Sequence, residues 1–282
     1  MIKGFYNFGG VMGKYPECRE VKVNFEIDGT QHEATEWKGL VDAAEVTKRW
    51  NIVGKGYKVA QHDEVASTVD KALEDLGLKP EVQPEVHNDG ARLHIGLRFP
   101  EIKLGLGADV ISMIAYFDNS YDSTTGLRLE IGAYQNDYII YVGGNYSKYY
   151  HRHTKGLQVS ALEKSINKGI DTFQRKVKAQ LESLVNTKVD PLVMSGWLND
   201  QIEKVEVDDE GSKEHKSAAV IPIKYLKAIK SRFDEVRGNM TNLWSVYNMV
   251  CQTLNKENVE KLDRLPTLCR NMYDALVKEF KH

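Results

Sequence analysis

The chain of 282 residues has only three cysteines, Cys18, Cys251 and Cys269, and no two of them form a Cys-x-x-Cys pair. This excludes a disulfide framework and a zinc knuckle, which need more cysteines at short spacings. The sequence also lacks the roughly 20 consecutive apolar residues of a membrane span. Residues 1–13, with Lys3 as their first cation, lack the apolar core of a signal peptide. We therefore expect a soluble protein of a reducing cytoplasm.

The sequence lacks the motifs of several enzyme classes. It contains no Gly-x-Ser-x-Gly, no His-Glu-x-x-His and no phosphate-binding loop; residues 10–15 have the wrong spacing and no Ser or Thr to hold Mg²⁺. The glycine-rich segments 54–59 and 105–110 both miss the third glycine of a dinucleotide fingerprint. We therefore expect no nucleotide chemistry and no cofactor.

The sequence has no excess of positive charge. Its 38 Lys and Arg residues face 40 Asp and Glu residues, which gives a net charge of −2. A protein that coats duplex DNA by charge alone is strongly basic, so this class is excluded. Any nucleic-acid site must be a local patch that acidic residues balance elsewhere.

What the sequence does have is tyrosine beside positive charge. Eight of its tyrosines lie between Tyr116 and Tyr150, and residues 151–155 read His-Arg-His-Thr-Lys ahead of a segment rich in lysine. Single strands bind where bases stack on exposed rings, at about 1–3 kcal/mol per base, beside cations that pair with phosphates. The pattern predicts a single-strand site. Its candidate residues are Tyr146, Lys148, Tyr149, Tyr150, His151, Arg152, His153, Lys155, Lys164 and Lys168.

Each part of this pattern also has a purely structural explanation. Tyrosine favours strands and packs well on a half-buried sheet. The cations of the segment after residue 160 can form an ordinary solvated helix face. Tyr146, Tyr149 and Tyr150 are the better binding candidates, because they follow the Gly143-Gly144 turn and precede the cations.

Hydrophobic periodicity predicts an α+β fold, in which an antiparallel, hairpin-built sheet with packed helices precedes a long amphipathic helix and a helical C-terminal part. Asp28-Gly29 and residues 88–90 predict tight hairpin turns, and Asp63 and Gly77 bound a predicted first helix. Predicted strands are 21–27, 81–87, 92–99, 110–117, 127–133 and 137–142. One long helix is predicted to start at Ser160. Four further helices are predicted at 191–205, 222–237, 241–254 and 266–280, and a loop is predicted at 207–213. We expect a β-rich α+β domain at 1–156 and a helical region at 157–282, packed together as one unit.

Four short segments occur in the order of a known family: Gly-Tyr-Lys-Val at 56–59, Asn-Ser-Tyr-Asp-Ser at 119–123, His-Arg-His-Thr at 151–154 and Thr-Asn-Leu-Trp-Ser-Val-Tyr-Asn at 241–248. The chain thus resembles the phage/plasmid-like protein family, the domain of unknown function 932, over roughly residues 37–255. The resemblance implies a viral or plasmid setting and no settled activity. The family usually has glycine where this chain has Ser123, and an Arg-x-Val-Cys-x-Asn strand where residues 137–141 lack both arginine and cysteine.

The residue types and their spacing also suggest three other candidate sites. Asp89, Glu101 and Lys103 have the order of the Asp…Glu-x-Lys set with which some nucleases hold Mg²⁺. His151 and His153 would share one side of a strand as paired metal ligands do, although a third ligand is missing nearby. Asp118 and Asp122 suit a phosphate or hydrated Mg²⁺ contact, and equally a turn.

The pattern favours a non-catalytic nucleic-acid-binding protein of a phage or plasmid, in the host cytoplasm, that binds single-stranded DNA and anneals strands as a homo-oligomer. A hairpin sheet that leads into a long basic helix is also the layout of single-strand annealing proteins, which is an analogy of fold alone. The alternatives are the metal-dependent nuclease and an interaction module that inhibits a host defence nuclease, with the acidic run 207–214 as a DNA mimic. The sequence does not determine whether the protein prefers DNA or RNA, how many copies form the oligomer, or which host protein is the target.

Overall fold

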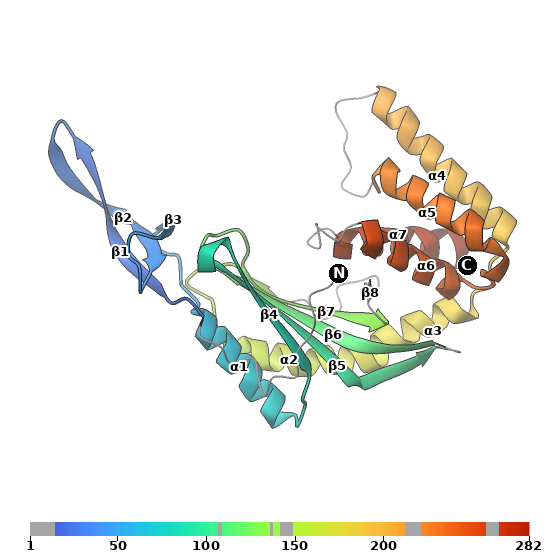
Figure 1. Ribbon diagram of the computed structural model, residues 1–282, viewed down its shortest axis with the longest axis horizontal. Helices are drawn as coiled ribbons and strands as arrows, with labels where there is room; N and C mark the ends of the chain where they lie inside the picture. The colour runs from blue at the N-terminus through green and yellow to red at the C-terminus, as the bar shows by residue number, and fades with distance from the viewer. Residues whose placement is uncertain are drawn as a thin grey trace.

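The computed structural model describes residues 15–106, 109–135, 138–141, 149–211, 221–257 and 265–281. The molecule is elongated, with a β-sheet arm at one end, a twisted central sheet in the middle and a group of helices at the other end (Figure 1). The expected α+β class is confirmed, since antiparallel sheets precede a helical C-terminal part.

The arm is a three-stranded antiparallel sheet of β1 (Cys18–Ile27), β2 (Thr30–Asp42) and β3 (Arg49–Gly54). The predicted turn between its first two strands is confirmed: Asp28 and Gly29 have φ values of +50° and +78°. Two successive residues with positive φ match the twist of a two-residue hairpin, which explains the Asp-Gly pair. β3 lies outside the strands that periodicity predicted.

The central sheet is an antiparallel meander in the order β4-β5-β6-β7-β8, and β9 also pairs with β7. Its hairpin at residues 88–90 is confirmed, with Asn88, Asp89 and Gly90 all at positive φ. Three strands differ from prediction by more than a few residues at an end or were missed: β5 extends to Leu106 and not only to Phe99, β8 is shorter than expected, and β9 was not predicted. The bounds are β4 Glu81–His87, β5 Arg92–Leu106, β6 Asp109–Ser120, β7 Leu127–Gln135, β8 Tyr138–Ile140 and β9 Tyr149–His151.

The two faces of the central sheet differ in chemistry. One face carries apolar side chains, among them Leu93, Phe117 and Leu129, all at most 2% exposed. Helix α1 (His62–Asp75) and the long helix formed by α2 (Ala161–Thr172), the π-helical turn η2 (Phe173–Val177) and α3 (Lys178–Asn186) cover it (Figure 1). The long helix from residue 160 is therefore confirmed. The other face carries polar and charged side chains.

Four more helices form the C-terminal part: α4 (Pro191–Gly211), α5 (Ile223–Val236), α6 (Leu243–Glu257) and α7 (Leu265–Phe280). All four were predicted. However, α4 extends to Gly211, so the prediction of a loop at residues 207–211 is wrong. Residues 212 and 213 and the side chains of the acidic run at 207–214 lie outside the described residues.

One hydrophobic cluster joins sheet and helices, from Ala60 and Leu93 through Leu162 to Leu276. The division at residues 156 and 157 stays a prediction, since packing alone does not define a boundary. None of the helices in the described part of the chain combines the length and apolar character needed to cross a membrane.

Candidate nucleic-acid interface

Two loops far apart in sequence are joined at the base of the arm. The first connects β3 to α1 and the second follows β9. The Lys58 N–H donates to the His153 carbonyl at 3.1 Å, and the ring Nδ1 of His153 lies 3.1 Å from the Lys58 carbonyl. The Lys58 ammonium donates to the Leu157 carbonyl at 2.7 Å. We call residues 54–60 and 151–158 together the paired loops.

Aromatic packing fixes the paired loops to the sheet. The His153 ring stacks on Tyr57 with centroids 4.9 Å apart, and the Tyr57 hydroxyl donates to the Ser120 carbonyl at 3.0 Å. His153 is 5% exposed, and burial lowers the pKa of its imidazole. The Gly-Tyr-Lys-Val, Asn-Ser-Tyr-Asp and His-Arg-His-Thr segments therefore meet at one place.

The paired loops present cations without acids. Residues 54–60 include Lys55 and Lys58, residues 151–158 include Arg152 and Lys155, and neither segment contains Asp or Glu. All four cationic residues are exposed. Arg152 and Lys155 were expected at the site. Lys55 and Lys58 were not. The contact between the loops places Lys58 there, and Lys55 lies three residues before it, where its N–H donates to the Glu36 carbonyl of β2 at 2.9 Å.

The structure separates the two tyrosines of β9. Tyr150 is opposite Arg128 on the polar face and is 51% exposed. Tyr149 is opposite Leu129 on the apolar face, packs against the core and donates its hydroxyl to the Gln158 carbonyl at 3.1 Å. Successive residues of a strand point to opposite faces, so only one of the pair is available for stacking.

The other candidate residues are dispersed. Lys164 and Lys168 lie on the exposed side of α2, whose opposite side packs over the apolar face of the sheet, so they do not join Tyr150. His151 is half-buried at the end of β9. Tyr146 and Lys148 lie outside the described residues. The remaining tyrosines of the cluster fit the structural explanation, because they are buried or packed against the core: Tyr116, Tyr121, Tyr134, Tyr138 and Tyr141.

Gly126 lets β9 approach β7. A Cβ atom at this position would lie 2.5 Å from the His151 carbonyl oxygen and 3.0 Å from the Tyr150 ring. We expect Gly126→Ala to displace β9 and to lower the free energy of unfolding by about 1–3 kcal/mol, as overpacking does. Urea denaturation measures this. Gly105→Ala is the matched control, since Gly105 also lies in a strand but has open space at its Cβ position; equal losses in both variants would contradict the close approach.

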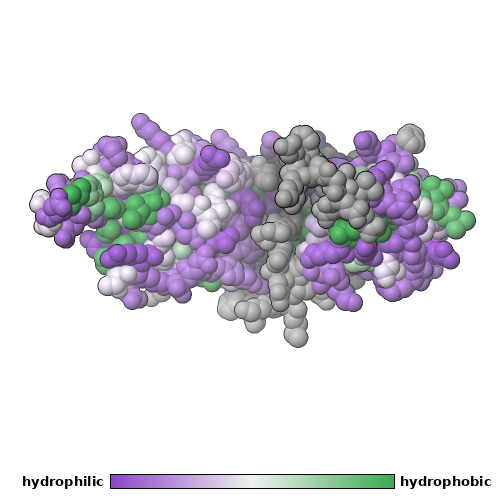
Figure 2. All heavy atoms as spheres, turned by 90° about the horizontal axis from the view of Figure 1, so that it is seen from above, coloured by the Kyte–Doolittle hydropathy of each residue, from purple (hydrophilic) through white to green (hydrophobic). Residues whose placement is uncertain are grey.

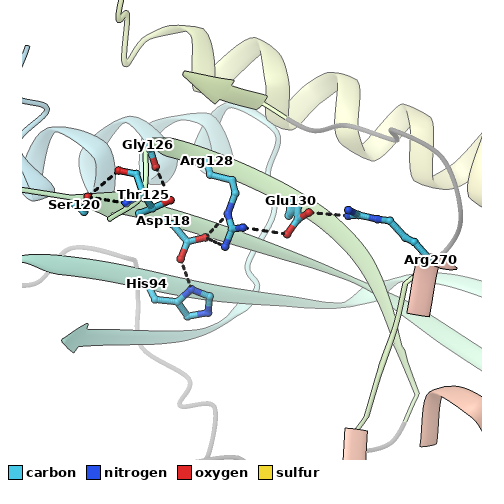
Figure 3. Close-up of polar contacts among 8 residues, drawn as sticks. All are labelled: His94, Asp118, Ser120, Thr125, Gly126, Arg128, Glu130 and Arg270. Atoms are coloured by element: carbon cyan, nitrogen blue, oxygen red, sulfur yellow. Dashed lines mark hydrogen bonds and ion pairs between the residues drawn. The ribbon is translucent and has the colours of Figure 1, made fainter. Parts of the chain in front are cut away.

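A chain of ion pairs crosses the polar face of the sheet (Figure 3). His94 on β5 donates from Nδ1 to Asp118 on β6 at 2.8 Å, and Arg128 on β7 donates from Nε to the other Asp118 oxygen at 2.8 Å. Arg128 also faces Glu130 at 3.8 Å, and Arg270 of α7 pairs with Glu130 at 2.7 Å. The chain thus ties three neighbouring strands to the C-terminal helices.

Electrostatics keep the centre of this chain charged. Burial would raise the pKa of Asp118, but the hydrogen bond and charge of His94 and the Arg128 guanidinium outweigh burial and hold the pKa below its ordinary value. Because both Asp118 oxygens are bound, this residue does not offer a free carboxylate to phosphate-bound Mg²⁺. Asp122 is engaged too, by Asn88 at 2.8 Å and by Thr124.

A second buried cluster lies where the arm joins the sheet. The Tyr121 ring is stacked between Trp50 and His62, with centroids 4.9 Å and 4.0 Å away. Asn119 Nδ2 lies 2.9 Å from His62 Nδ1, and His62 Nε2 lies 3.2 Å from the Gly90 carbonyl. A carbonyl only accepts, so Nε2 carries the proton and Nδ1 accepts from the Asn119 amide.

The nuclease set does not converge. Asp89 lies in the turn before β5, where its carbonyl accepts from the Trp50 indole at 3.4 Å. Glu101 lies nine residues beyond Arg92 along the same strand, which at about 3.3 Å per residue puts it roughly 30 Å away. Asp89 therefore cannot share a metal ion with Glu101 and Lys103. Within the described ranges, no three His, Cys, Asp or Glu side chains gather as metal ligands would.

The fourth segment, residues 241–248, lies at the far end of the sheet. The Trp244 indole donates to Asp109 at 2.8 Å, and Asn248 donates to Gln135 at 3.1 Å. These bonds fasten α6 to β6 and β7. This segment therefore acts in packing and does not extend the paired loops.

Comparison with known proteins adds a family and no activity. A family model described as "Domain of unknown function (DUF932)" matches residues 49–276, which is most of the chain. No curated protein and no solved structure matches the chain. The matched range includes both of the paired loops.

Proposed function

The chain belongs to the DUF932 family, a domain family of unknown function, and from the geometry of the site we propose that it binds single-stranded nucleic acid on the paired loops and Tyr150. The phage or plasmid setting and the annealing of strands belong to the same proposal. In this proposal the protein binds nucleic acid and is not catalytic.

The observation that carries the proposal is the convergence of cations on the paired loops. Two segments about 95 residues apart are joined by the hydrogen bonds of Lys58 with His153 and Leu157. They carry four exposed cationic residues, Lys55, Lys58, Arg152 and Lys155, and neither segment contains an acid. The contacts of Tyr57, Lys58 and His153 hold the backbone of both loops, so the segments that carry the cations are in place before a ligand arrives. A binding site with fixed positions loses less conformational entropy on binding.

The mechanism follows from the two kinds of side chain. The cations neutralise successive phosphates and release counterions, which supplies affinity without sequence preference. Tyr150, at 51% exposure, offers a ring on which one base can stack, whereas a base in a duplex is already stacked on its neighbours. The proposal therefore includes tighter binding to single strands than to duplex.

The charge test compares two pairs of cations. We expect Arg152→Ala with Lys155→Ala to lower the slope of log affinity against log salt by roughly 1–2 units, at about 0.7 per lost phosphate contact on a single strand. Fluorescence anisotropy of a labelled oligonucleotide between 50 and 200 mM salt measures the slope. Lys164→Ala with Lys168→Ala is the matched control, because these cations lie on the exposed side of α2 and outside the paired loops. Equal slopes in all three proteins would reject the paired loops as the site.

The stacking test compares the two tyrosines of β9. Tyr150→Ala is expected to weaken binding by about 1–3 kcal/mol per stacked base, with an unchanged salt slope and an unchanged melting temperature. Tyr149→Ala is expected to lower the melting temperature instead, because Tyr149 packs against the core. Affinity per folded molecule, measured beside thermal unfolding, separates the two effects. A loss of stability in Tyr150→Ala without a loss of affinity would remove the stacking part.

A further inference from the structure

A second patch of aromatic, apolar and cationic side chains lies at the base of the arm and adjoins the paired loops. Figure 2 shows apolar side chains at the surface of the arm, on the left, beside hydrophilic ones. Trp37 of β2 is 55% exposed and is opposite Gly54 of β3, the first residue of the paired loops. The next residue, Lys55, donates its N–H to the Glu36 carbonyl at 2.9 Å. The patch is therefore continuous with the paired loops through two neighbouring strands.

The register of the three strands places this patch on one face of the arm. Opposite residues of neighbouring strands point to the same face, and successive residues of a strand alternate. The face of Trp37 therefore includes Gly39 with its opposite residues Val21 and Ile52, and Val41 with its opposite residues Arg19 and Arg49. The other face carries Leu40 and Val53, which belong to the buried cluster with Tyr121. We call the face of Trp37, Ile52, Arg19 and Arg49 the arm platform.

The centre of the arm platform is apolar and open. Ile52 is 58% exposed. A Cβ atom at Gly39 would lie 2.9 Å from the Val21 side chain, so Val21 leans over the glycine and levels the surface. A Cβ atom at Gly54 would meet no atom within 4 Å, so the opposite strand leaves the space beside Trp37 open. A flat group can therefore lie against the Trp37 ring.

Two cations complete the arm platform. Arg19 and Arg49 are exposed, and neither has an ion-pair partner among the described residues. Their row, at Val41, lies four residues along β2 from Trp37, which at about 3.3 Å per residue is roughly 13 Å. Phosphates of one strand follow each other at about 3.4 Å along the axis of duplex DNA. The platform is therefore long enough for more than one nucleotide.

The acids of the arm lie off this platform. Glu36 precedes Trp37 in β2, so its side chain points to the other face. Three other acids are engaged by lysines: Glu20 by Lys38 at 2.7 Å, Glu33 by Lys22 at 2.9 Å and Asp42 by Lys48 at 3.8 Å. The rest lie beside the hairpin turn or outside the three strands: Glu26, Asp28, Glu17 and Glu45. The rows of the platform thus combine two arginines and an exposed indole with no acid.

We infer that the arm platform is a second stacking site for the same nucleic-acid strand, with Trp37 against a base and Arg19 and Arg49 against phosphates. An exposed indole favours a flat ring, and unpaired arginines favour an anion. Single-stranded nucleic acid combines both, and its bases are free to stack on protein rings. The bound strand then runs from Tyr150 over the paired loops to Trp37. This inference rests on the proposed function, because it extends the site on the paired loops.

The test measures the affinity for a fluorescent oligothymidine of about 16 nucleotides, a length within the range of known single-strand sites, by anisotropy. Trp37→Leu keeps an apolar side chain and removes the aromatic ring. It is expected to weaken binding about 5- to 150-fold, which corresponds to about 1–3 kcal/mol per stacked base at about 1.4 kcal/mol per tenfold. Trp37→Phe retains a ring for stacking and is expected to stay within about threefold of the native affinity. Phe25→Leu is the matched control, because Phe25 is a 46% exposed aromatic residue at the hairpin end of the arm.

Tryptophan fluorescence reports the contact directly. Trp37 is the most exposed of the four tryptophans, since Trp50 is half-buried and Trp197 and Trp244 are at most 8% exposed. A base stacked on Trp37 is therefore expected to quench the emission of the native protein. In Trp37→Phe this quenching is expected to disappear while binding persists, a result that a purely structural role of Trp37 does not produce.

A second variant tests the cations and does not depend on the folding of Trp37→Leu. Arg19→Ala with Arg49→Ala is expected to lower the slope of log affinity against log salt by roughly 1–2 units, at about 0.7 per lost phosphate contact on a single strand. Melting temperatures confirm that the exposed positions of both variants leave the fold intact. An unchanged slope in the arginine variant would remove the platform from the path of the strand.

The outcomes separate this inference from the proposed function. A native affinity in Trp37→Leu, quenching that persists in Trp37→Phe, or an equal loss in Phe25→Leu would each overturn the inference. If the native chain dimerises in sedimentation velocity and Trp37→Leu is monomeric with unchanged affinity, the platform belongs to a second copy of the chain. In each of these cases a lower salt slope in Arg152→Ala with Lys155→Ala still supports binding on the paired loops. A native chain that binds no oligonucleotide rejects both.

Discussion

Replacing Tyr121 by alanine is expected to lower the free energy of unfolding by about 3–5 kcal/mol, the range of large core truncations. Tyr121 is fully buried and is stacked between Trp50 and His62. Its hydroxyl accepts the His62 N–H at 2.8 Å and lies 3.1 Å from the Gln61 side-chain oxygen. The truncation therefore removes both the packing and the hydrogen bonds that join the arm to the sheet.

Urea denaturation with matched variants separates these two contributions. Tyr121→Phe retains the ring and removes the hydroxyl, so we expect a smaller loss of about 1–3 kcal/mol from the unsatisfied backbone N–H. Tyr150→Ala is the surface control and should stay within about 0.5 kcal/mol. A loss below 1 kcal/mol in Tyr121→Ala would show that the arm contributes little to the stability of the body.

Local patterns were enough to predict most of the fold. The Asp28-Gly29 pair and the residues around Gly90 set hairpin turns through positive φ, and both hairpins are confirmed. The apolar spacing after residue 160 predicted the long helix, although not its π-helical turn. These features depend on residues near each other in sequence, so a single sequence contains the necessary information.

The site needed contacts between distant residues, and the sequence alone predicted only part of it. β9 has three residues, too few for a periodicity to be read, so nothing in the sequence shows which of Tyr149 and Tyr150 is buried. Lys58 joins the site through bonds to residues about 95 positions away. Similarly, His94, Asp118 and Arg128 become partners only through the register of three strands.

The family resemblance contained one physical signal that composition did not. Ser123, where the family usually has glycine, has φ of +61°. This left-handed conformation suits glycine, since other side chains are disfavoured there. In this chain the Ser123 hydroxyl accepts from the Asn51 amide at 2.9 Å, a contact that glycine would lack and that offsets part of the strain.

Acid is expected to destabilise the protein between pH 6.5 and about pH 4 through His62. Burial lowers the pKa of this imidazole from 6.5 to about 4, so in this range the unfolded chain binds a proton that the folded chain does not. The contribution of neutral His62 to the free energy of unfolding is therefore fully present above pH 6.5, and it is lost as the pH falls through this window. At about 1.4 kcal/mol per pKa unit, the contribution lost by pH 4 is roughly 3 kcal/mol.

The hydrogen bonds explain why His62 resists protonation. A second proton on Nδ1 would face the Asn119 amide, which already donates to that nitrogen at 2.9 Å and to the Ala60 carbonyl at 2.8 Å. Rotating the Asn119 amide by 180° would let its oxygen accept from the protonated Nδ1 of His62. The same oxygen would then face the Ala60 carbonyl, which is also an acceptor. Either arrangement leaves a buried polar group without a proper partner, which costs about 1–3 kcal/mol.

The measurement is the free energy of unfolding from urea denaturation at pH 7.5, 6.5, 5.5 and 4.5. These values stay above the ordinary pKa of Asp, about 3.9, and of Glu, about 4.3. The pKa of Asp118 is lowered further, whereas burial raises the pKa of Asp274, so the difference between the native protein and His62→Gln isolates the contribution of the histidine. His62→Gln is expected to be less stable at pH 7.5 but to show a much smaller decline toward pH 4.5, because glutamine has no proton to gain and its amide can still donate to the Gly90 carbonyl. His153→Gln removes the smaller contribution of a second buried histidine, whose pKa is also lowered by burial. Two outcomes would contradict this prediction: a native protein that is as stable at pH 4.5 as at pH 7.5, and a His62→Gln variant whose free energy of unfolding falls as much as that of the native protein. Either would show that protonation of His62 does not destabilise the junction between the arm and the sheet.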